Sequence, residues 1–278
     1  MAVTRLELLD AGRLEDVVDL CRRCLPEAPS VGELSASLYS AQQTVTVRGA
    51  SGVGIVASVC EGTQGYIRLL GVDPAERRRG HGTTLLRSAE DDLMGQGATS
   101  VQVGADPPFY LYPGVETTQT AMLCFLERHR YERGESNFNM GVDLDEIPED
   151  PGGHHLAKPE EYHEVGTWMR RHWPNWEAEA LRALERSALV ISRDDGGMAG
   201  FCAFDVNRSG VLGPTAVRGD LWGHGKGRPL IIGALHHMRA RGHRRAEVGW
   251  VGPVRPYARI GAEVRRVFFV FRRTLGRA

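Results

Sequence analysis

The chain has 278 residues, of which 42% are hydrophobic and 25% are charged, and its formal net charge is −1. This balance is typical of a soluble globular protein, and the weak charge argues against nucleic acid or an anionic membrane as a partner. The length exceeds one ordinary domain and suits two. We expect a cytoplasmic protein, because the sequence shows no signal peptide and no run approaching the ~18 apolar residues of a membrane span.

In the first half of the chain, short β-type runs alternate with helical patterns. The segment 145–153 that follows is acidic, rich in Pro and Gly, and without periodicity, which is typical of an interdomain linker. In chain order the predicted elements are a strand at 3–9, a helix at 14–24, a hairpin of 44–48 and 54–60, a strand at 66–72, a helix at 83–94, a strand at 100–104, a helix at 118–129 and a strand at 137–144.

The second half repeats this order. A shift of 145 positions places Gly80 on Gly225, and the neighbouring glycine and the apolar anchors of the flanking strands and helix coincide as well, which indicates a duplication. The sequence therefore predicts two copies of one α/β domain, at 1–146 and 154–278. The predicted elements of the second copy are helices at 160–171 and 176–186, strands at 188–192, 200–206 and 211–217, a helix at 230–240, and strands at 246–250 and 264–272.

Cysteine and histidine spacing does not predict a metal or disulfide site. The five cysteines are an odd number at scattered positions. Cys21 and Cys24 have the spacing of a redox pair, but they lie in a helical pattern without a second pair, so buried thiols are the favoured interpretation. The adjacent histidines at 154–155 and 236–237 lack a Cys, Asp or Glu set at ligand-like spacing. We therefore expect no metal.

The loop Arg77–Gly82, with the sequence Arg-Arg-Arg-Gly-His-Gly, joins a predicted strand to a predicted helix. Its glycines let the backbone approach an anion, and its arginines supply fixed charge and bidentate donors for phosphate oxygens. The helix N-terminus adds about half a unit of positive charge. The loop fits neither the dinucleotide fingerprint Gly-x-Gly-x-x-Gly nor a Walker A motif.

The segment Val72–Leu86 resembles the acetyl-CoA motif of the GCN5-related N-acetyltransferase (GNAT) superfamily. In that family the loop cradles the pyrophosphate, and the preceding strand pairs with the pantetheine arm through its backbone. The resemblance implies acetyl-CoA as cofactor and two tandem domains, each a mixed, mostly antiparallel sheet flanked by helices. The cofactor-binding residues that it implies in the first half are Leu70, Gly71, Val72, Arg77, Arg78, Arg79, Gly80, His81, Gly82, Thr83 and Thr84.

The corresponding loop of the second half keeps both glycines but has Trp222 where the family has arginine or glutamine. Nearby Lys226 and Arg228 can restore the lost charge. Whether this loop still binds coenzyme A stays open at this point, with binding the favoured interpretation. The residues expected to take part are Val217, Gly223, His224, Gly225, Lys226 and Gly227.

Acetyl transfer from a thioester to an amine benefits from an acid beside the departing thiolate and from a base or water relay that keeps the amine neutral. The family often places a tyrosine acid after the fifth strand, in the pattern Tyr-x-x-x-Gly-Phe. The segment Pro256–Ala262 resembles this pattern with Tyr257 as the acid, whereas Leu126 takes that place in the first half and can donate nothing.

Three carboxylates are candidates for the base. Glu247 and Asp205 belong to predicted strands, and Asp106 follows a strand at the point where such domains open toward substrate. Each also has an interpretation as a solvated or structural carboxylate. We predict Glu247 as the second catalytic residue beside Tyr257.

Two further segments, Phe109–Val115 and Val248–Val254, resemble tandem acetyltransferases that act on glucosamine and glucosaminides. The resemblance implies direct transfer of acetyl from acetyl-CoA to the primary amine of a small molecule, with an amino sugar as the leading substrate. The alternative is a coenzyme A-binding regulatory pseudoenzyme, because Leu126 and Trp222 each break the pattern of one domain. Neither the amine nor the oligomeric state follows from the sequence.

Overall fold

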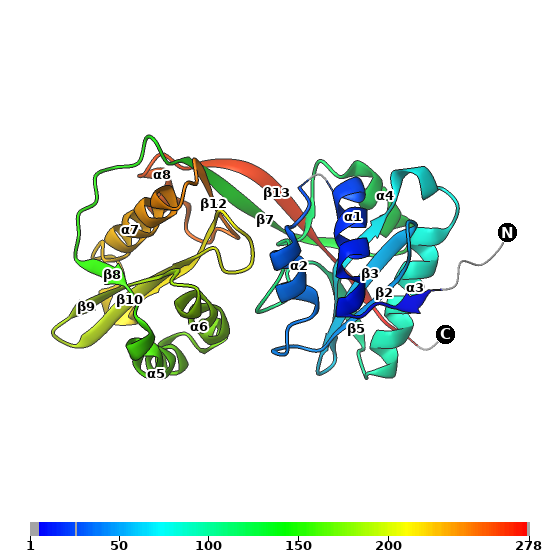
Figure 1. Ribbon diagram of the computed structural model, residues 1–278, viewed down its shortest axis with the longest axis horizontal. Coiled ribbons are helices and arrows are strands. Elements are labelled where there is room, and N and C mark those ends of the chain that lie inside the picture. Colours follow the sequence, from blue (N-terminus) through cyan, green and yellow to red (C-terminus); the bar gives the residue numbers. More distant parts are fainter. Residues whose placement is uncertain (1–5, 26, 277–278) are drawn as a thin grey trace. The chain divides into compact units, whose positions relative to one another are not determined.

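The structure is a computed structural model that describes residues 6–25 and 27–276 (Figure 1). The described chain forms two compact units. Unit 1 contains the residues up to Asn137 and those from Phe268 on, and unit 2 contains Phe138–Val267. No helix in the described ranges is long and apolar enough to cross a membrane.

Unit 1 is an α/β unit built on a mostly antiparallel sheet. The described part of the predicted strand at 3–9 contains β1, and the other predicted elements are present with shifts of a few residues at their ends. Its elements are β1 (Glu7–Leu8), α1 (Leu14–Cys24), α2 (Val31–Leu38), β2 (Val45–Ala50), β3 (Gly54–Glu61), β4 (Gln64–Val72), α3 (His81–Gly95), β5 (Ser100–Val103), β6 (Val115–Glu116), α4 (Thr120–Arg128) and the first part of β7 (Glu132–Asp143).

Unit 2 repeats this plan. Short α8 and β8 are additions that the sequence pattern did not reveal, because each has too few residues for a recognisable period. Its elements are β8 (His154–Leu156), α5 (Tyr162–His172), α6 (Glu177–Glu185), β9 (Leu189–Asp194), β10 (Gly197–Phe204), β11 (Val211–Val217), α7 (Gly227–Ala240), β12 (Arg245–Val248), α8 (Val254–Ala258) and the first part of β13 (Glu263–Thr274).

The sheets of both units follow one order. In unit 1, β1, β2, β3 and β4 are neighbours in an antiparallel series, and β5 pairs in parallel with β4. In unit 2, β8, β9, β10 and β11 form the same series, and β12 pairs in parallel with β11. These mixed, mostly antiparallel sheets confirm the predicted fold class.

The two units differ from the predicted domains 1–146 and 154–278, because the second part of the last strand of each half belongs to the other unit. The second part of β13 pairs with β5, with Phe271 opposite Val103. The second part of β7 pairs with β12, with Met140 opposite Val248. Each unit is therefore completed by a strand from the other half of the sequence.

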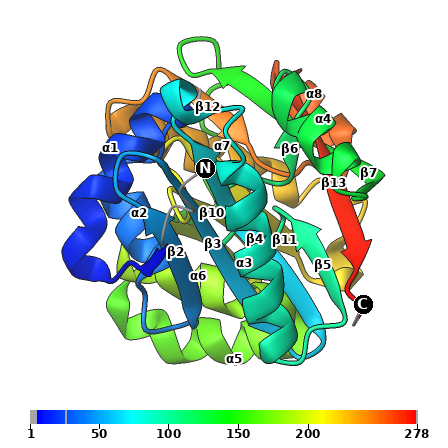
Figure 2. The same cartoon turned by 90° about the vertical axis from the view of Figure 1, so that its right-hand side faces the viewer.

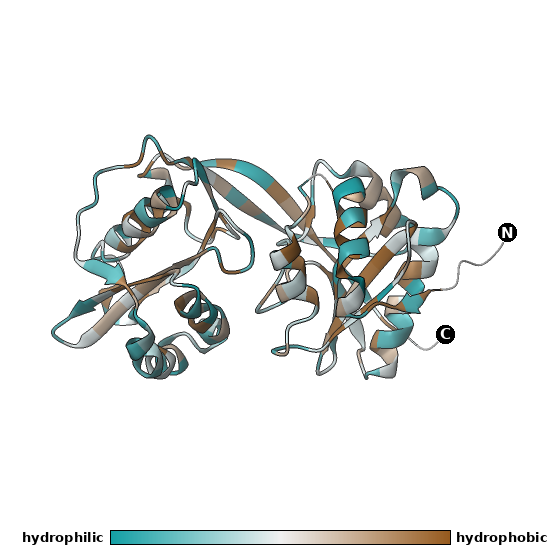
Figure 3. Ribbon diagram, viewed as in Figure 1, coloured by the Kyte–Doolittle hydropathy of each residue, from teal (hydrophilic) through white to brown (hydrophobic). Residues whose placement is uncertain are grey.

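Helices cover the sheet on both faces. In unit 1, α1 and α2 pack on one face over a core that includes Leu34 and Ile55, and α3 and α4 pack on the other over a core that includes Leu85 and Leu126 (Figure 2). The hydrophobic residues follow the central strands and the inner helix faces (Figure 3). In unit 2, one core cluster joins α5, α6 and α7 to the sheet.

Candidate functional site

The sheet of unit 1 opens at the end of β4. The parallel pairing of β4 with β5 ends at Ile67 and Val103, where the N–H of Gly104 donates to the carbonyl of Ile67. β4 continues to Val72 beside β3 alone, past a β-bulge at Arg68. Bulges re-aim strands and are frequent next to functional sites. We call the space between the separated strands the unit 1 gap.

The backbone at the end of β4 is oriented toward this gap. The N–H of Asp73 donates to the carbonyl of Val53 in 2.9 Å, on the β3 side. Because backbone groups alternate in direction along a strand, those of Leu70 and Val72 point away from β3 and toward the gap. The carbonyl of Val72 accepts a hydrogen bond of 3.1 Å from Nε of Arg77.

The first glycine loop has the geometry of a tight turn into a helix. Gly80 stands at the helix N-cap with φ 90°, which favours glycine, and Arg78 has φ 63°. The side chains of Arg78 and Arg79 are exposed, and Arg79 forms a 2.9 Å ion pair with Glu76. A Cβ on Gly82 would lie 3.3 Å from the ring of Phe125, so a small residue is needed there.

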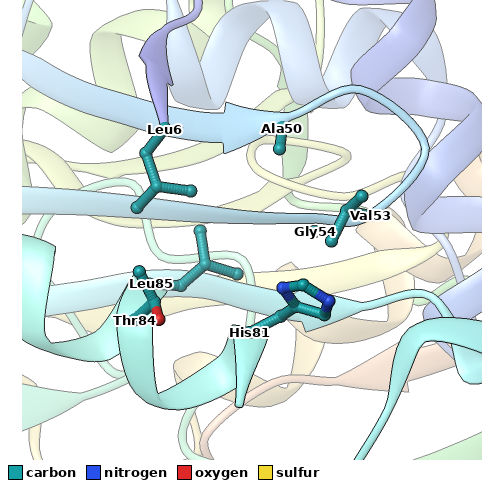
Figure 4. A pocket seen from close by; sticks show the side chains of 7 residues that line it. All are labelled: Leu6, Ala50, Val53, Gly54, His81, Thr84 and Leu85. Carbon is teal, nitrogen blue, oxygen red and sulfur yellow. The ribbon is translucent and has the colours of Figure 1, made fainter. Parts of the chain in front are cut away.

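The side chains of the first turn of α3 have internal roles in this structure. Thr83 Oγ1 lies 3.0 Å from His129 Nε2, and Thr84 Oγ1 donates to the carbonyl of Gly80 in 3.3 Å. A small hollow beside this turn contains the side chains of His81 and Thr84 on the β3 side of β4, opposite the gap (Figure 4). Its lining residues are Leu6, Ala50, Val53, Gly54, His81, Thr84 and Leu85.

Unit 2 opens in the same way. β11 pairs with β12 only at Val211 and Leu212, and the N–H of Gly249 donates to the carbonyl of Leu212. β11 then continues beside β10 to Val217. The N–H of Arg218 donates to the carbonyl of Ala199, so the alternation directs the backbone of residues 215 and 217 into the unit 2 gap.

The second glycine loop differs from the first in what caps the strand end. The carbonyl of Val217 accepts two hydrogen bonds, of 3.3 Å from Nε1 of Trp222 and of 3.2 Å from Nε1 of Trp173. Trp222 therefore replaces Arg77 in its contact with the strand but not in its charge. Gly223 and Gly225 have φ of 81° and 74°, and a Cβ on either would meet nothing within 4 Å, so the loop surface is open.

Tyr257 lies on α8 with only 8% of its surface exposed. It forms a side-chain hydrogen bond with Thr215 on the gap-side part of β11, and burial is the main cause that raises the pKa of Tyr257 to about 12. The phenol therefore keeps its proton near neutral pH and can donate it. In unit 1 the matching position, Leu126, is fully buried and apolar.

The predicted base, Glu247, has fixed partners. Its carboxylate accepts from the side-chain amide of Asn139 and lies 3.3 Å from Nη1 of Arg266. Asn139 in turn accepts from the N–H of Trp250 in 2.7 Å. These contacts tie Glu247 to β7 and to the segment after β12, so proton abstraction by this carboxylate would compete with an ion pair.

The other two carboxylates have structural surroundings. Asp106 is fully buried against Arg68 at 2.5 Å, and burial, partly offset by Arg68, raises the pKa of Asp106 to about 6. Asp205 accepts from the N–H of Gly210 in 2.7 Å within the turn between β10 and β11. In the described parts of the chain, no three His, Cys, Asp or Glu side chains gather as a metal site.

Two residues of this site do not stand out in the sequence motifs: Thr215, the partner of Tyr257, and Trp173, the second donor to the carbonyl of Val217. Thr215 carried a usable signal, because it aligns with Leu70 at the 145-residue shift and is a polar residue in an apolar series. Trp173 carried none, since its contact depends on how the end of α5 packs on β11.

Part of the chain matches a known family. The acetyltransferase (GNAT) family model matches residues 28–109. No curated protein matches the sequence. Among solved structures, a GCN5-related glucosamine N-acetyltransferase region of a fungal multi-domain GH3 β-N-acetylglucosaminidase has a TM-score of 0.78 at 20% identity over 98% of this chain.

Two further structures share the whole plan. A GCN5-related N-acetyltransferase from Sphaerobacter thermophilus has a TM-score of 0.73 at 18% identity, with 99% of this chain and 96% of that chain covered. A tandem GNAT protein from the clavulanic acid biosynthesis pathway has a TM-score of 0.73 at 17% identity, with 99% and 100% covered. The chain spans only 38% of the fungal protein. The family match therefore covers part of the first half of the chain, and tandem GNAT structures share its fold over nearly its full length.

Proposed function

We propose that the protein transfers acetyl from acetyl-CoA to the primary amine of a small molecule, foremost an amino sugar, and that unit 2 carries the reaction. The observation that carries this proposal is the Tyr257 hydroxyl, hydrogen-bonded to Thr215 at the open edge of β11. No side chain at the matching place in unit 1 can donate a proton, because Leu126 is there. Since acetyl-CoA is a cytoplasmic metabolite, we place the reaction in the cytoplasm.

The residues of unit 2 fit the cofactor. The backbone groups of residue 215 and the N–H of residue 217 face the gap, where they can pair with the amides of a pantetheine arm. The open loop at Gly223 and Gly225 leads into α7, whose N-terminus favours phosphate, and Lys226 is exposed beside it. The cofactor supplies the acetyl group as an activated thioester. As the amine nitrogen bonds to the carbonyl carbon and the carbon–sulfur bond breaks, Tyr257 gives its proton to the departing sulfur, and the proton that the nitrogen loses passes to water, from which the phenol regains its own.

Unit 2 also leaves more room beside its gap than unit 1 does. At the 145-residue shift, Arg68 and Asp106 of unit 1 correspond to Gly213 and Val251 of unit 2. The buried ion pair fills this place in unit 1. A Cβ on Gly213 would meet only one backbone oxygen, at 3.9 Å. An acceptor therefore has space in unit 2 where unit 1 has side chains.

Trp250 supports a sugar as the acceptor. It lies two residues after the end of β12, with φ 45° and 42% of its surface exposed. A non-glycine residue held in the left-handed region is a mark of functional sites, and an exposed ring can pack on the apolar face of a sugar. The fungal structure described above is a glucosamine N-acetyltransferase region, which favours the same class.

An acetylation screen tests the proposal. Wild-type protein would be assayed with acetyl-CoA and a thiol reporter against amino sugars, polyamines, amino acids and peptides. We expect turnover to be highest with an amino sugar. Acetyl-CoA binding without turnover on any amine would contradict the enzyme and favour the regulatory pseudoenzyme.

A further inference from the structure

Three polar side chains meet in the core of unit 2. Cys202 and Thr215 are direct partners in the register of β10 and β11, and Cys202 Sγ lies 2.9 Å from Thr215 Oγ1. Thr215 also bonds to Tyr257. Cys202 is fully buried and Tyr257 nearly so. The three groups form one series of hydrogen bonds beside the part of β11 that borders the unit 2 gap.

The same three places are apolar in unit 1. There Val56 pairs with Leu70 across β3 and β4, as Cys202 pairs with Thr215, and Leu126 stands in place of Tyr257. All three unit 1 side chains belong to a single hydrophobic core cluster. The fold is thus complete without polar groups here. Their joint presence in one copy only indicates a role other than packing.

The hydrogen bonds among these three side chains can determine where the hydroxyl proton of Tyr257 points. Burial raises the pKa of the Cys202 thiol to about 12, so the thiol keeps its proton and can donate it to Thr215. Thr215 can then donate to the oxygen of Tyr257, which leaves the Tyr257 proton for an acceptor in the gap. In the reverse direction Tyr257 donates to Thr215 and Thr215 to Cys202. The thiol of Cys202 then donates to the carbonyl of Ala203, 3.8 Å from Sγ. In this reverse direction each of the three donors has a partner.

We infer that Thr215 is a positioning residue, which holds the Tyr257 hydroxyl at the unit 2 gap and stabilises it while its proton leaves, with Cys202 setting the direction of the hydrogen bonds. The inference rests on the proposed function of Tyr257. A threonine suits the task because its β-branch restricts χ1, so the hydroxyl is held in place. A donor to the phenol oxygen favours the deprotonated form and makes Tyr257 a stronger acid.

Kinetics of matched variants test the inference. Thr215→Val keeps the shape and removes the hydroxyl, and Thr215→Ser keeps the hydroxyl. We expect Thr215→Val to lower kcat about tenfold or more, with the KM for acetyl-CoA within about twofold, because only the proton donor is disturbed. Thr215→Ser should restore most of the rate. Cys202→Val, which copies Val56 of unit 1, should give a smaller fall in kcat.

A spectroscopic readout separates the contact from the catalysis. With ¹³Cζ-labelled tyrosine, the Tyr257 resonance is assigned by its loss in Tyr257→Phe. We expect this resonance to shift in Thr215→Val and to return toward its wild-type position in Thr215→Ser. An unchanged resonance in folded Thr215→Val would overturn the inference.

The two proposals can fail separately. Turnover by wild-type protein with an equal kcat in Thr215→Val would overturn the positioning role alone. An absence of turnover by wild-type protein on every amine would overturn the proposed function, and the catalytic role of Thr215 with it.

Discussion

The two units share one strand–loop–helix plan, but they differ at two places: the glycine loop and the position that Tyr257 occupies in unit 2. Unit 1 has a loop with exposed Arg78 and Arg79, and a buried leucine, Leu126, where unit 2 has Tyr257. Unit 2 has indole donors at the end of β11, and the Tyr257 hydroxyl is hydrogen-bonded to Thr215 on the same strand. After a duplication, the positive charge of the glycine loop can be kept in one copy and a proton donor in the other. Binding strength in one unit need not mark where the reaction occurs.

The largest effect is expected when the proton donor of unit 2 is removed. Tyr257→Phe should lower kcat by about 100-fold or more, the lower range for a positioned general acid, with little change in acetyl-CoA affinity. Since the pKa of Tyr257 is raised to about 12, its acid form persists, and wild-type kcat should show no alkaline fall from this group up to about pH 10. Steady-state kinetics over pH measure both. Unchanged turnover in Tyr257→Phe would move the active site to unit 1.

The buried ion pair between Arg68 and Asp106 lies in unit 1, and its contribution to stability can be measured. Asp106→Asn leaves the guanidinium of Arg68 buried without its counter-charge, and we expect a loss of about 3–5 kcal/mol in the free energy of unfolding. Chemical denaturation measures this change. Asp145→Asn is the control, because Asp145 pairs with Arg244 at 3.7 Å in an exposed place, and it should change stability little. Equal losses in the free energy of unfolding for Asp106→Asn and Asp145→Asn would show that the buried ion pair contributes no more to stability than an exposed one.

Much of this comparison could be predicted from the sequence, because the glycines and apolar anchors of the two loops recur at one spacing. The catalytic role of Tyr257 stays a prediction, and it came from a short motif and not from the 145-residue spacing. The exchange of β7 and β13 could not be predicted, since a strand pattern records alternation and not the sheet that it joins. Contacts such as Arg68–Asp106, 38 residues apart, were hidden because pairing of buried charges depends on where the bulge in β4 aims the side chain.

The charge of the first loop gives the next effect. Arg78→Gln with Arg79→Gln removes two exposed cations and spares Arg77, which holds the end of β4. We expect acetyl-CoA binding to unit 1 to weaken about tenfold, as for charge-assisted hydrogen bonds lost at a partly solvated site. Calorimetric titration measures this, with turnover unchanged. Arg244→Gln, at an 88% exposed side chain, is the control. A parallel loss of turnover would place catalysis in unit 1.

The proposed contact between Trp250 and the amino sugar is tested by a substitution that makes unit 2 resemble unit 1. Trp250 corresponds to Ala105, and both have positive φ, so Trp250→Ala copies the unit 1 residue onto the same backbone. We expect the KM for the amino sugar to rise about tenfold, because an aromatic contact is worth roughly 1 kcal/mol beyond the apolar area that it buries. The KM for acetyl-CoA should stay constant. An equal rise in both would mean that the indole supports the fold of the site and not the acceptor.

The smallest effect is expected from restoring the family residue in the second loop. Trp222→Arg supplies the missing cation, and the carbonyl of Val217 keeps its hydrogen bond from Trp173, so the strand end stays satisfied. We expect acetyl-CoA to bind unit 2 about threefold more tightly, since one exposed charge contributes less than about 1 kcal/mol. The titration is made in the Arg78→Gln, Arg79→Gln background, so that unit 1 contributes little. Weaker binding in Trp222→Arg would mean that the indole itself contacts the cofactor. The second loop would then be a different kind of cofactor site, and not a weakened copy of the first.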